Sequence, residues 1–135
     1  MTLQTVCEKV ASICRTVGGV RSAPAIPQDG SAVFPLVVVF PGRGVLQTQS
    51  GGFMTALHDV VAQVHVARKD LAADMTALYP LMDKIPQAIL SDVTLGGTCQ
   101  TFDRIDYEMM QMSWAGIETI GVQMTLVGVK LQPTI

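Results

Sequence analysis

The stretch VFPLVVVF, residues 33–40, decides the fold class expected for this chain. Its β-branched and aromatic residues favour a β-strand, and Pro41, Gly42 and Gly44 are expected to end that strand. Pro35 has no backbone N–H to donate within a sheet, so pairing should begin after it or leave that edge free. Because both faces of the strand are apolar, one should be covered by a helix and the other, in an oligomer, by a neighbouring subunit.

The residues after this strand predict a hairpin. Residues 45–52 are polar and glycine-rich, and with the prolines and glycines before them they predict a mobile hairpin tip over residues 41–52. Residues 53–67 then alternate, with His58 and Val60 on one face and Asp59 and His65 on the other. A period of two is typical of a half-buried strand, here antiparallel to the first.

Two segments have the periodicity of helices. Residues 2–17 place apolar side chains three and four positions apart, and Gly18 and Gly19 stop this helix before an irregular connector over residues 20–31. Residues 70–84 repeat the pattern, with acidic residues in the first turns, where the helix dipole favours them. Pro80 is expected either to kink this helix or to begin a second short helix that continues through residues 85–90.

The last third predicts a second hairpin. Residues 100–112 and 118–131 alternate in polarity on either side of a turn at Trp114-Ala115-Gly116, and residues 94–98 form an earlier turn. The element order is therefore α-β-β-α-β-β. The expected fold is a single α+β domain, residues 1–135, in two layers: a four-stranded antiparallel or mixed sheet of two β-hairpins, with helices packed on one face.

Composition favours an oligomer and disfavours several function classes. Of the 135 residues, 49% are hydrophobic and only 15% are charged, so part of the apolar surface is expected to meet another subunit. The net charge of -2 argues against gripping nucleic acid, although a mildly acidic surface suits a channel through which DNA slides. The longest apolar run is too short to cross a bilayer, and no secretion signal is seen, so no membrane is expected and the cytosol of the cell that makes the chain is the expected location.

The sequence offers no group that predicts catalysis, a metal or a cofactor. The glycine pairs lack the Lys-Ser/Thr of a phosphate loop. The three cysteines, an odd number, predict reduced thiols, and Cys7 and Cys14 fall on the buried stripe of the first helix. His58 and His65 should lie on opposite strand faces, as solvent-facing or edge residues rather than metal ligands.

One cluster suits either an interface or plain core packing. Met110, Met112 and Trp114 should share one face of their strand, with Met109 on the other. Methionine adapts to irregular surfaces, and tryptophan often anchors interfaces.

The carboxy-terminal half resembles the tail-terminator, or tail-completion, proteins of siphophages. The resemblance is carried by LYPLMDKIPQAIL (residues 78–90), DVTLGGT (92–98), YEMMQMSW (107–114) and TIGVQMTLVGVK (119–130). It covers under half of the chain, and it is a likeness of pattern and element order. It implies a ring, hexameric in this family, in the neck of the virion, where it ends polymerisation of the tail tube and joins the tail to the head connector.

The resemblance implies several partners: further copies of the chain, the tail tube protein, the connector or stopper protein, and genomic DNA passing through the lumen without specific binding. The surface expected to make these contacts consists of Arg43, Val45, Gln47, Phe53, Met110, Met112 and Trp114. Two alternatives stay open: another neck or tube ring protein, and a small enzyme with a site between subunits. The second would use Arg104, Asp106 and Glu108, which are otherwise a solvated strand face.

Overall fold

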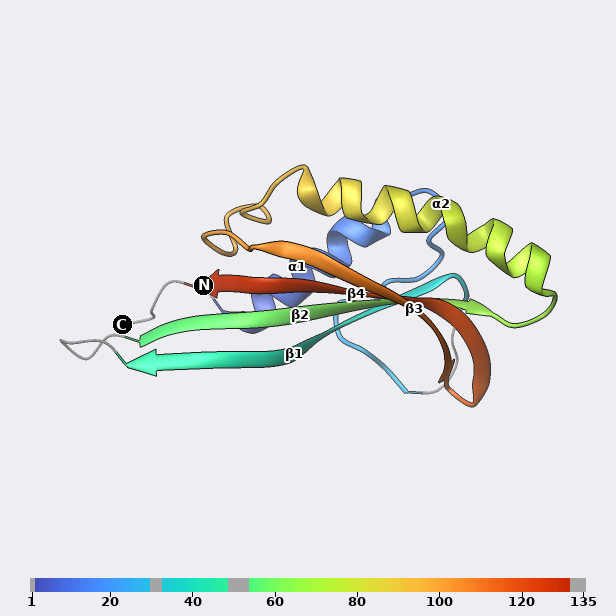
Figure 1. Cartoon of the computed structure of the whole chain (residues 1–135), viewed down its shortest axis with the longest axis horizontal. Coiled ribbons are helices and arrows are strands. Elements are labelled where there is room, and N and C mark those ends of the chain that lie inside the picture. Colours follow the sequence, from blue (N-terminus) through green and yellow to red (C-terminus); the bar gives the residue numbers. More distant parts are fainter. Residues whose placement is uncertain (1, 30–32, 49–53, 132–135) are drawn as a thin grey trace.

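Two β-hairpins join through their second strands into one antiparallel sheet, and both helices lie on the same side of it (Figure 1). The computed structural model describes residues 2–29, 33–48 and 54–131. The elements are α1 (Leu3–Arg15), β1 (Leu36–Thr48), β2 (Met54–Ala67), α2 (Leu71–Leu90), β3 (Arg104–Trp114) and β4 (Ile117–Leu131). The strand order is β1-β2-β4-β3, so the predicted α+β class, the antiparallel pairing and the element order are confirmed.

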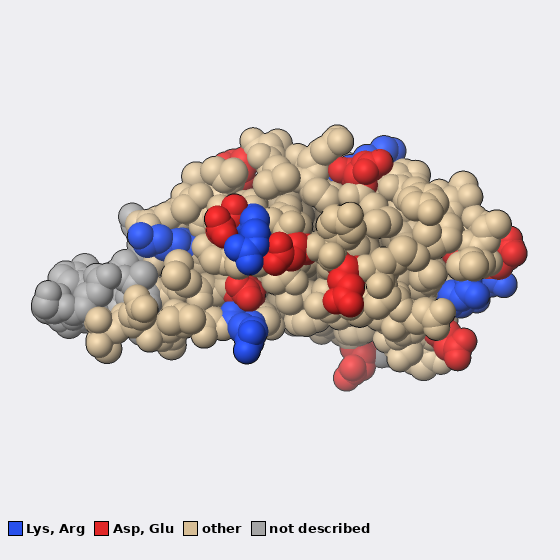
Figure 2. All heavy atoms as spheres, viewed as in Figure 1, with Lys and Arg blue, Asp and Glu red and all other residues tan. Residues whose placement is uncertain are grey.

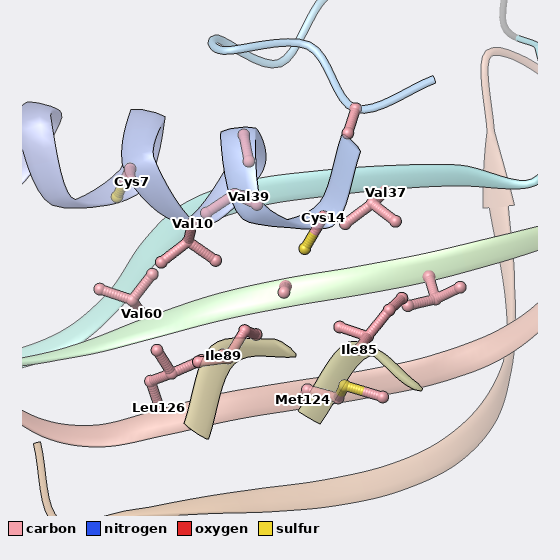
Figure 3. Packing of buried hydrophobic residues seen from close by; sticks show 14 of the residues in the cluster. Cys7, Val10, Cys14, Val37, Val39, Val60, Ile85, Ile89, Met124 and Leu126 are labelled. Carbon is pink, nitrogen blue, oxygen red and sulfur yellow. The ribbon is translucent and has the colours of Figure 1, made fainter. Parts of the chain in front are cut away.

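The core lies between the helices and one face of the sheet. Val10 and Cys14 of α1 are fully buried together with Val37 of β1, and Ile85 and Ile89 of α2 are fully buried with the middle of β4 (Figure 3). Thr2 caps α1 by accepting a hydrogen bond from the backbone N–H of Thr5 at 3.1 Å. The apolar stripes that predicted two helices are therefore the stripes that the sheet buries.

The second helix is continuous where the sequence suggested that a new helix might begin. Pro80 and Pro86 both lie inside α2, so the alternative of a separate short helix over residues 85–90 is wrong. Each proline removes one backbone hydrogen bond, but the buried side chains of Leu81 and Ile85 hold this part of the helix against the sheet. Asp74, expected only to interact with the helix dipole, is buried and accepts from Arg68 Nη1 at 2.7 Å.

The first strand is longer than predicted. It begins directly after Pro35, as expected, but it does not end at Pro41 and Gly42 and runs to Thr48. The expected loop over residues 41–52 is therefore wrong for residues 41–48, and residues 49–52 lie outside the described residues. A β-bulge between Pro41 and Gly44 accommodates the extra residue, and the edge position of β1 tolerates a proline without a donor.

A second bulge lies on the other side of β2. In β4 one extra residue is inserted between Leu126 and Val129, where Gly128 has φ 72°. Both bulges lie opposite Asp59, whose Oδ1 accepts a hydrogen bond from the Gly128 N–H at 3.3 Å. Before the bulges the helix-facing residues have odd numbers in β1 and even numbers in β4. Beyond the bulges they have even numbers in β1 and odd numbers in β4.

The second hairpin closes with a two-residue turn. Ala115 and Gly116 both have positive φ values, 53° and 76°, as in the tight turns that suit the twist of β-hairpins. β3 begins at Arg104 rather than near Gln100, because residues 92–103 form a loop. Asp92 organises its start by accepting from the N–H groups of Thr94 and Gly96 at 3.0 and 2.9 Å.

Candidate subunit interface

The face of the sheet away from the helices, here called the open face, contains most of the residues expected at an interface. Strand pairing puts Met110, Met112 and Trp114 of β3 on this face, and Val45 and Gln47 of β1 are on it as well. Arg43 lies in the β1 bulge, and Phe53 lies outside the described residues. The two groups occupy opposite edges and opposite ends of the sheet, so they form two separate patches.

The first patch is the distal half of the β1–β2 hairpin, here called the arm: residues 43–48 of β1 and 54–59 of β2. Val45 and Leu46 are 53% and 62% exposed, and Leu57 is 37% exposed. Val45 pairs with Leu57 on the open face, whereas Leu46 points to the helix side. The arm thus shows apolar side chains on both sides, and its surface at the β1 end is largely without charge (Figure 2).

A hollow of about 440 Å³ lies at the base of the arm. Arg43, Val45, Leu57 and Asp59 line it together with Val127 and Gly128 of β4. The two bulges shape this hollow, because each adds a residue at the level of Asp59. The hollow thus combines one guanidinium and one carboxylate with an otherwise apolar lining.

The second patch consists of Met110, Met112 and Trp114, and it is partly covered by packing within the chain itself. The ring of Trp114 is tilted at 49° against the ring of His65, with 5.6 Å between the ring centroids. Trp114, Met110 and Met112 are each half-buried. Gly121 makes room for them, because a Cβ there would run into the carbonyl oxygen of Val64 and approach Met112 Cε at 3.0 Å.

The prediction that His65 faces solvent or an edge is wrong, since its side chain is fully buried on the inner strand β2. Its Nε2 lies 3.1 Å from Gln63 Oε1, which can only accept, so Nε2 carries the proton. Nδ1 then accepts from the Thr119 hydroxyl at 2.8 Å, and Gln63 Nε2 donates onward to Gln123 Oε1 at 2.9 Å. Burial lowers the pKa of His65 to about 4, so this chain contains a neutral imidazole at physiological pH.

The proximal part of the open face does not need a neighbouring subunit to cover it. Leu36 and Val38 point away from the helices, yet they are only 3% and 1% exposed. The chain that precedes β1 passes on this side of the sheet (Figure 1). The expectation that a second subunit covers this face of residues 33–40 is therefore wrong for Leu36 and Val38.

The helix side of β3 is exposed, which the sequence did not indicate. Tyr107 and Met109 pair with Met124 and Val122, so they point to the helix side, yet they are 69% and 40% exposed. The cause is the width of the helix layer: α1 packs on β1 and β2, and α2 packs mainly on β2 and β4. Alternation predicts which face a side chain takes, but not where the covering layer stops.

The charged group on β3 is a solvated surface. Arg104 pairs with Asp103 at 2.7 Å and with Asp106 at 3.0 Å, and each of these side chains is more than half exposed. Glu108 on the same strand is exposed as well. Exposed pairs of this kind contribute little to stability, and this one does not converge on a cavity.

The described residues include few reactive or metal-binding groups. Within residues 2–29, 33–48 and 54–131 no three His, Cys, Asp or Glu side chains come together as metal ligands. Cys7, Cys14 and Cys99 are unbridged, as predicted; Cys7 and Cys14 are buried as expected, and Cys99, for which burial was not predicted, is buried as well. Burial raises the pKa of Cys14 to about 12, which keeps the thiol protonated. Among the helices of this described part, none has the length and apolar character needed to span a bilayer.

Comparison with known proteins adds no further constraint. No protein-family model matches the chain, and no curated protein sequence matches it significantly.

Proposed function

We propose that this chain is a structural virion protein of a long-tailed phage that forms a ring, hexameric by family resemblance, at the head-proximal end of the tail. The observation that carries the proposal is the exposure of apolar side chains at two separate places, the arm and the helix side of β3, in a domain with a complete core. The arm presents Leu46 at 62% exposure, and β3, at the opposite sheet edge, presents Tyr107 at 69%.

Two different exposed patches favour a head-to-tail contact between copies. A two-fold dimer uses one patch twice, whereas a ring needs two unlike surfaces that complement each other. The arm and β3 belong to opposite edges of the sheet, so each subunit can contact two neighbours at once. A contact of this kind closes into a ring when the rotation between subunits allows it.

The position in the virion follows from the resemblance of residues 78–130 to tail terminators. A ring at that position would end polymerisation of the tail tube on one side and bind the connector or stopper protein on the other. The net charge of -2 suits a lumen through which genomic DNA passes without being held. Two helices beside a four-stranded sheet favour a terminator over a stopper, which should be a mostly β barrel.

The proposal is tested with the purified full chain and cognate tail tubes. Native mass spectrometry and negative-stain microscopy should show closed rings about as wide as a tail, and adding the chain to polymerising tube protein should cap the tubes and shorten them. Arm variant Leu46→Ser should reduce both effects, and Leu90→Ser, an exposed leucine on α2, serves as its matched control. A chain that stays monomeric at high concentration and leaves tube length unchanged would refute the proposal.

A further inference from the structure

We propose that the ring contact is made by Tyr107 and Met109 of one copy entering an apolar groove at the β1 edge of the next copy. This inference depends on the proposed ring: it keeps β3 as one surface of the contact and specifies the other as this groove, which lies at the same β1 edge as the arm. The groove and the two side chains lie on the helix side of the sheet, at its two opposite edges.

The groove is large enough for side chains of this size. It has a volume of about 410 Å³ and lies between the first turns of α1, the connector before β1, and β1 itself. Leu3, Ile26, Val39 and Pro41 are among its lining residues, and Gln4 at its rim is the one amide side chain in the lining. Ile26 is 57% exposed, so this wall of the groove is left open to solvent in a single copy.

The other half of the contact is the uncovered helix side of β3. Tyr107 is the most exposed of the large hydrophobic residues described, and Met109 follows it two positions later on the same side. A tyrosine combines a large apolar ring with a hydroxyl that can remain hydrated at a rim or donate to Gln4 Oε1, while Gln4 Nε2 donates to Glu8 Oε1 at 2.9 Å. An adaptable methionine beside it suits an irregular groove.

The topology aligns these two surfaces. All neighbouring strands are antiparallel, so across the order β1-β2-β4-β3 the first and last strands run in opposite directions. Two copies placed side by side in the same orientation therefore bring β3 of one copy antiparallel to β1 of the next. Both helix layers then lie on one side, which puts Tyr107 and Met109 on the same side as the groove.

Side chains rather than a long backbone ladder should make this contact. At its start β1 already uses its outer edge, because the Val37 N–H donates to the Ser22 carbonyl oxygen at 2.8 Å. Pro41 has no N–H, and the bulge that follows interrupts the edge. We therefore expect side chains inserted into the groove to stabilise the contact between copies more than backbone hydrogen bonds along this edge.

The charges near the two surfaces are complementary. Arg43 is the only charged residue of β1, and it lies just beyond the groove. Since β3 would run antiparallel to β1, the residues that precede Tyr107 would approach Arg43. The charged residues among them are Asp103, Arg104 and Asp106, whose charges sum to -1 although both carboxylates also pair with Arg104. The arrangement with both helix layers on one side therefore also brings Arg43 of one copy near a group of net negative charge on the next.

Cysteine cross-linking tests the contact in the full chain. Gln4→Cys combined with Tyr107→Cys and treated with a short bismaleimide should give a ladder of dimers, trimers and higher species up to the ring size in denaturing gels. Each single variant reports the background from the native, buried thiols. Gln4→Cys combined with Asp83→Cys, an exposed position on α2, is the matched control and should give no ladder.

Charge substitutions provide the second measurement. Tyr107→Glu and Ile26→Glu should each raise the concentration needed for half-maximal assembly at least 10-fold, because a carboxylate would be buried in an apolar groove, while the circular dichroism spectrum stays unchanged. Tyr79→Glu, an exposed tyrosine on α2, should assemble like the unmodified chain.

The outcomes separate the two proposals. Rings that form without cross-links and tolerate Tyr107→Glu would overturn the groove contact and leave the ring intact. Dimers alone, linked through Tyr107 on both copies, would indicate a symmetric edge contact and also overturn it. A chain that is monomeric at every concentration would overturn both the contact and the ring.

Discussion

The two ends of β1 differ sharply in the exposure of their apolar side chains, although they belong to one continuous strand. Val37 and Val39 are 0% and 1% exposed under α1, whereas Val45 and Leu46, past the bulge, are 53% and 62% exposed. Residues of the same type thus stabilise the fold at one end and remain uncovered at the other. Apolar side chains in this strand therefore contribute to folding only where another part of the chain covers them, and elsewhere they are available to a partner.

The largest effect is expected when one buried and one exposed leucine are each truncated to alanine. Leu81→Ala removes a fully buried side chain from α2 and should lower the free energy of unfolding by about 2–5 kcal/mol. Leu46→Ala should change it by less than ~0.5 kcal/mol and act on assembly instead. Urea denaturation at low protein concentration measures both, and equal losses would contradict the distinction between buried and uncovered apolar side chains.

A second substitution tests the close approach in the middle of the sheet. Gly121→Ala places a Cβ against the Val64 carbonyl oxygen and should destabilise the fold by roughly 1–3 kcal/mol through overpacking. Gly18→Ala is the control, because a Cβ there meets nothing within 4 Å. Thermal unfolding of the two variants should differ clearly, and similar midpoints would show that the sheet relaxes around residue 121.

The buried imidazole predicts a dependence of stability on pH. The pKa of His65 is about 4 in the folded chain and near 6.5 when unfolded, so between these values the unfolded chain binds more protons. This contribution to stability is complete above pH 6.5 and is lost as the pH falls toward 4. Denaturation midpoints at several pH values should fall less steeply for His65→Gln than for the unmodified chain; parallel curves would remove His65 as the cause.

The smallest effect concerns the turn of the second hairpin. Ala115 has φ 53°, a conformation that costs an L-residue with a Cβ about 1–2 kcal/mol. Ala115→Asn should recover up to about 1 kcal/mol, since asparagine followed by glycine suits this turn. A higher midpoint in thermal unfolding is expected, and a lower midpoint would contradict the turn assignment.

Local periodicity was sufficient to predict the architecture. The three- and four-residue spacing before Gly18 and the alternation before Ala67 each mark an element that the structure contains. The distal half of β1 was missed because its glycines and glutamines look like a loop, and only pairing with β2 makes it a strand. Likewise Pro80 interrupts the pattern locally, but packing of its neighbours keeps the helix whole.

The candidate interface was harder to predict than the fold. Val45 is expected at an interface from its place in the predicted loop tip, and Met110 from the methionine-rich alternation of its strand; the structure puts both on the open face. The burial of His65 could not be foreseen, because its partner Thr119 is 54 positions away in the sequence. The exposure of Tyr107 was equally hidden, since it depends on how far the helix layer extends across the sheet.

The paired bulges at Asp59 determine where the arm points. A bulge increases the local twist of a sheet, and two of them at one level, in β1 and in β4, act on both sides of β2. Deletion of Gly42 would remove one of them while the strand pairs above and below it could stay as they are. The arm would then leave the body at a new angle with its side chains unaltered, and assemblies built through it would be expected to differ in diameter in electron micrographs.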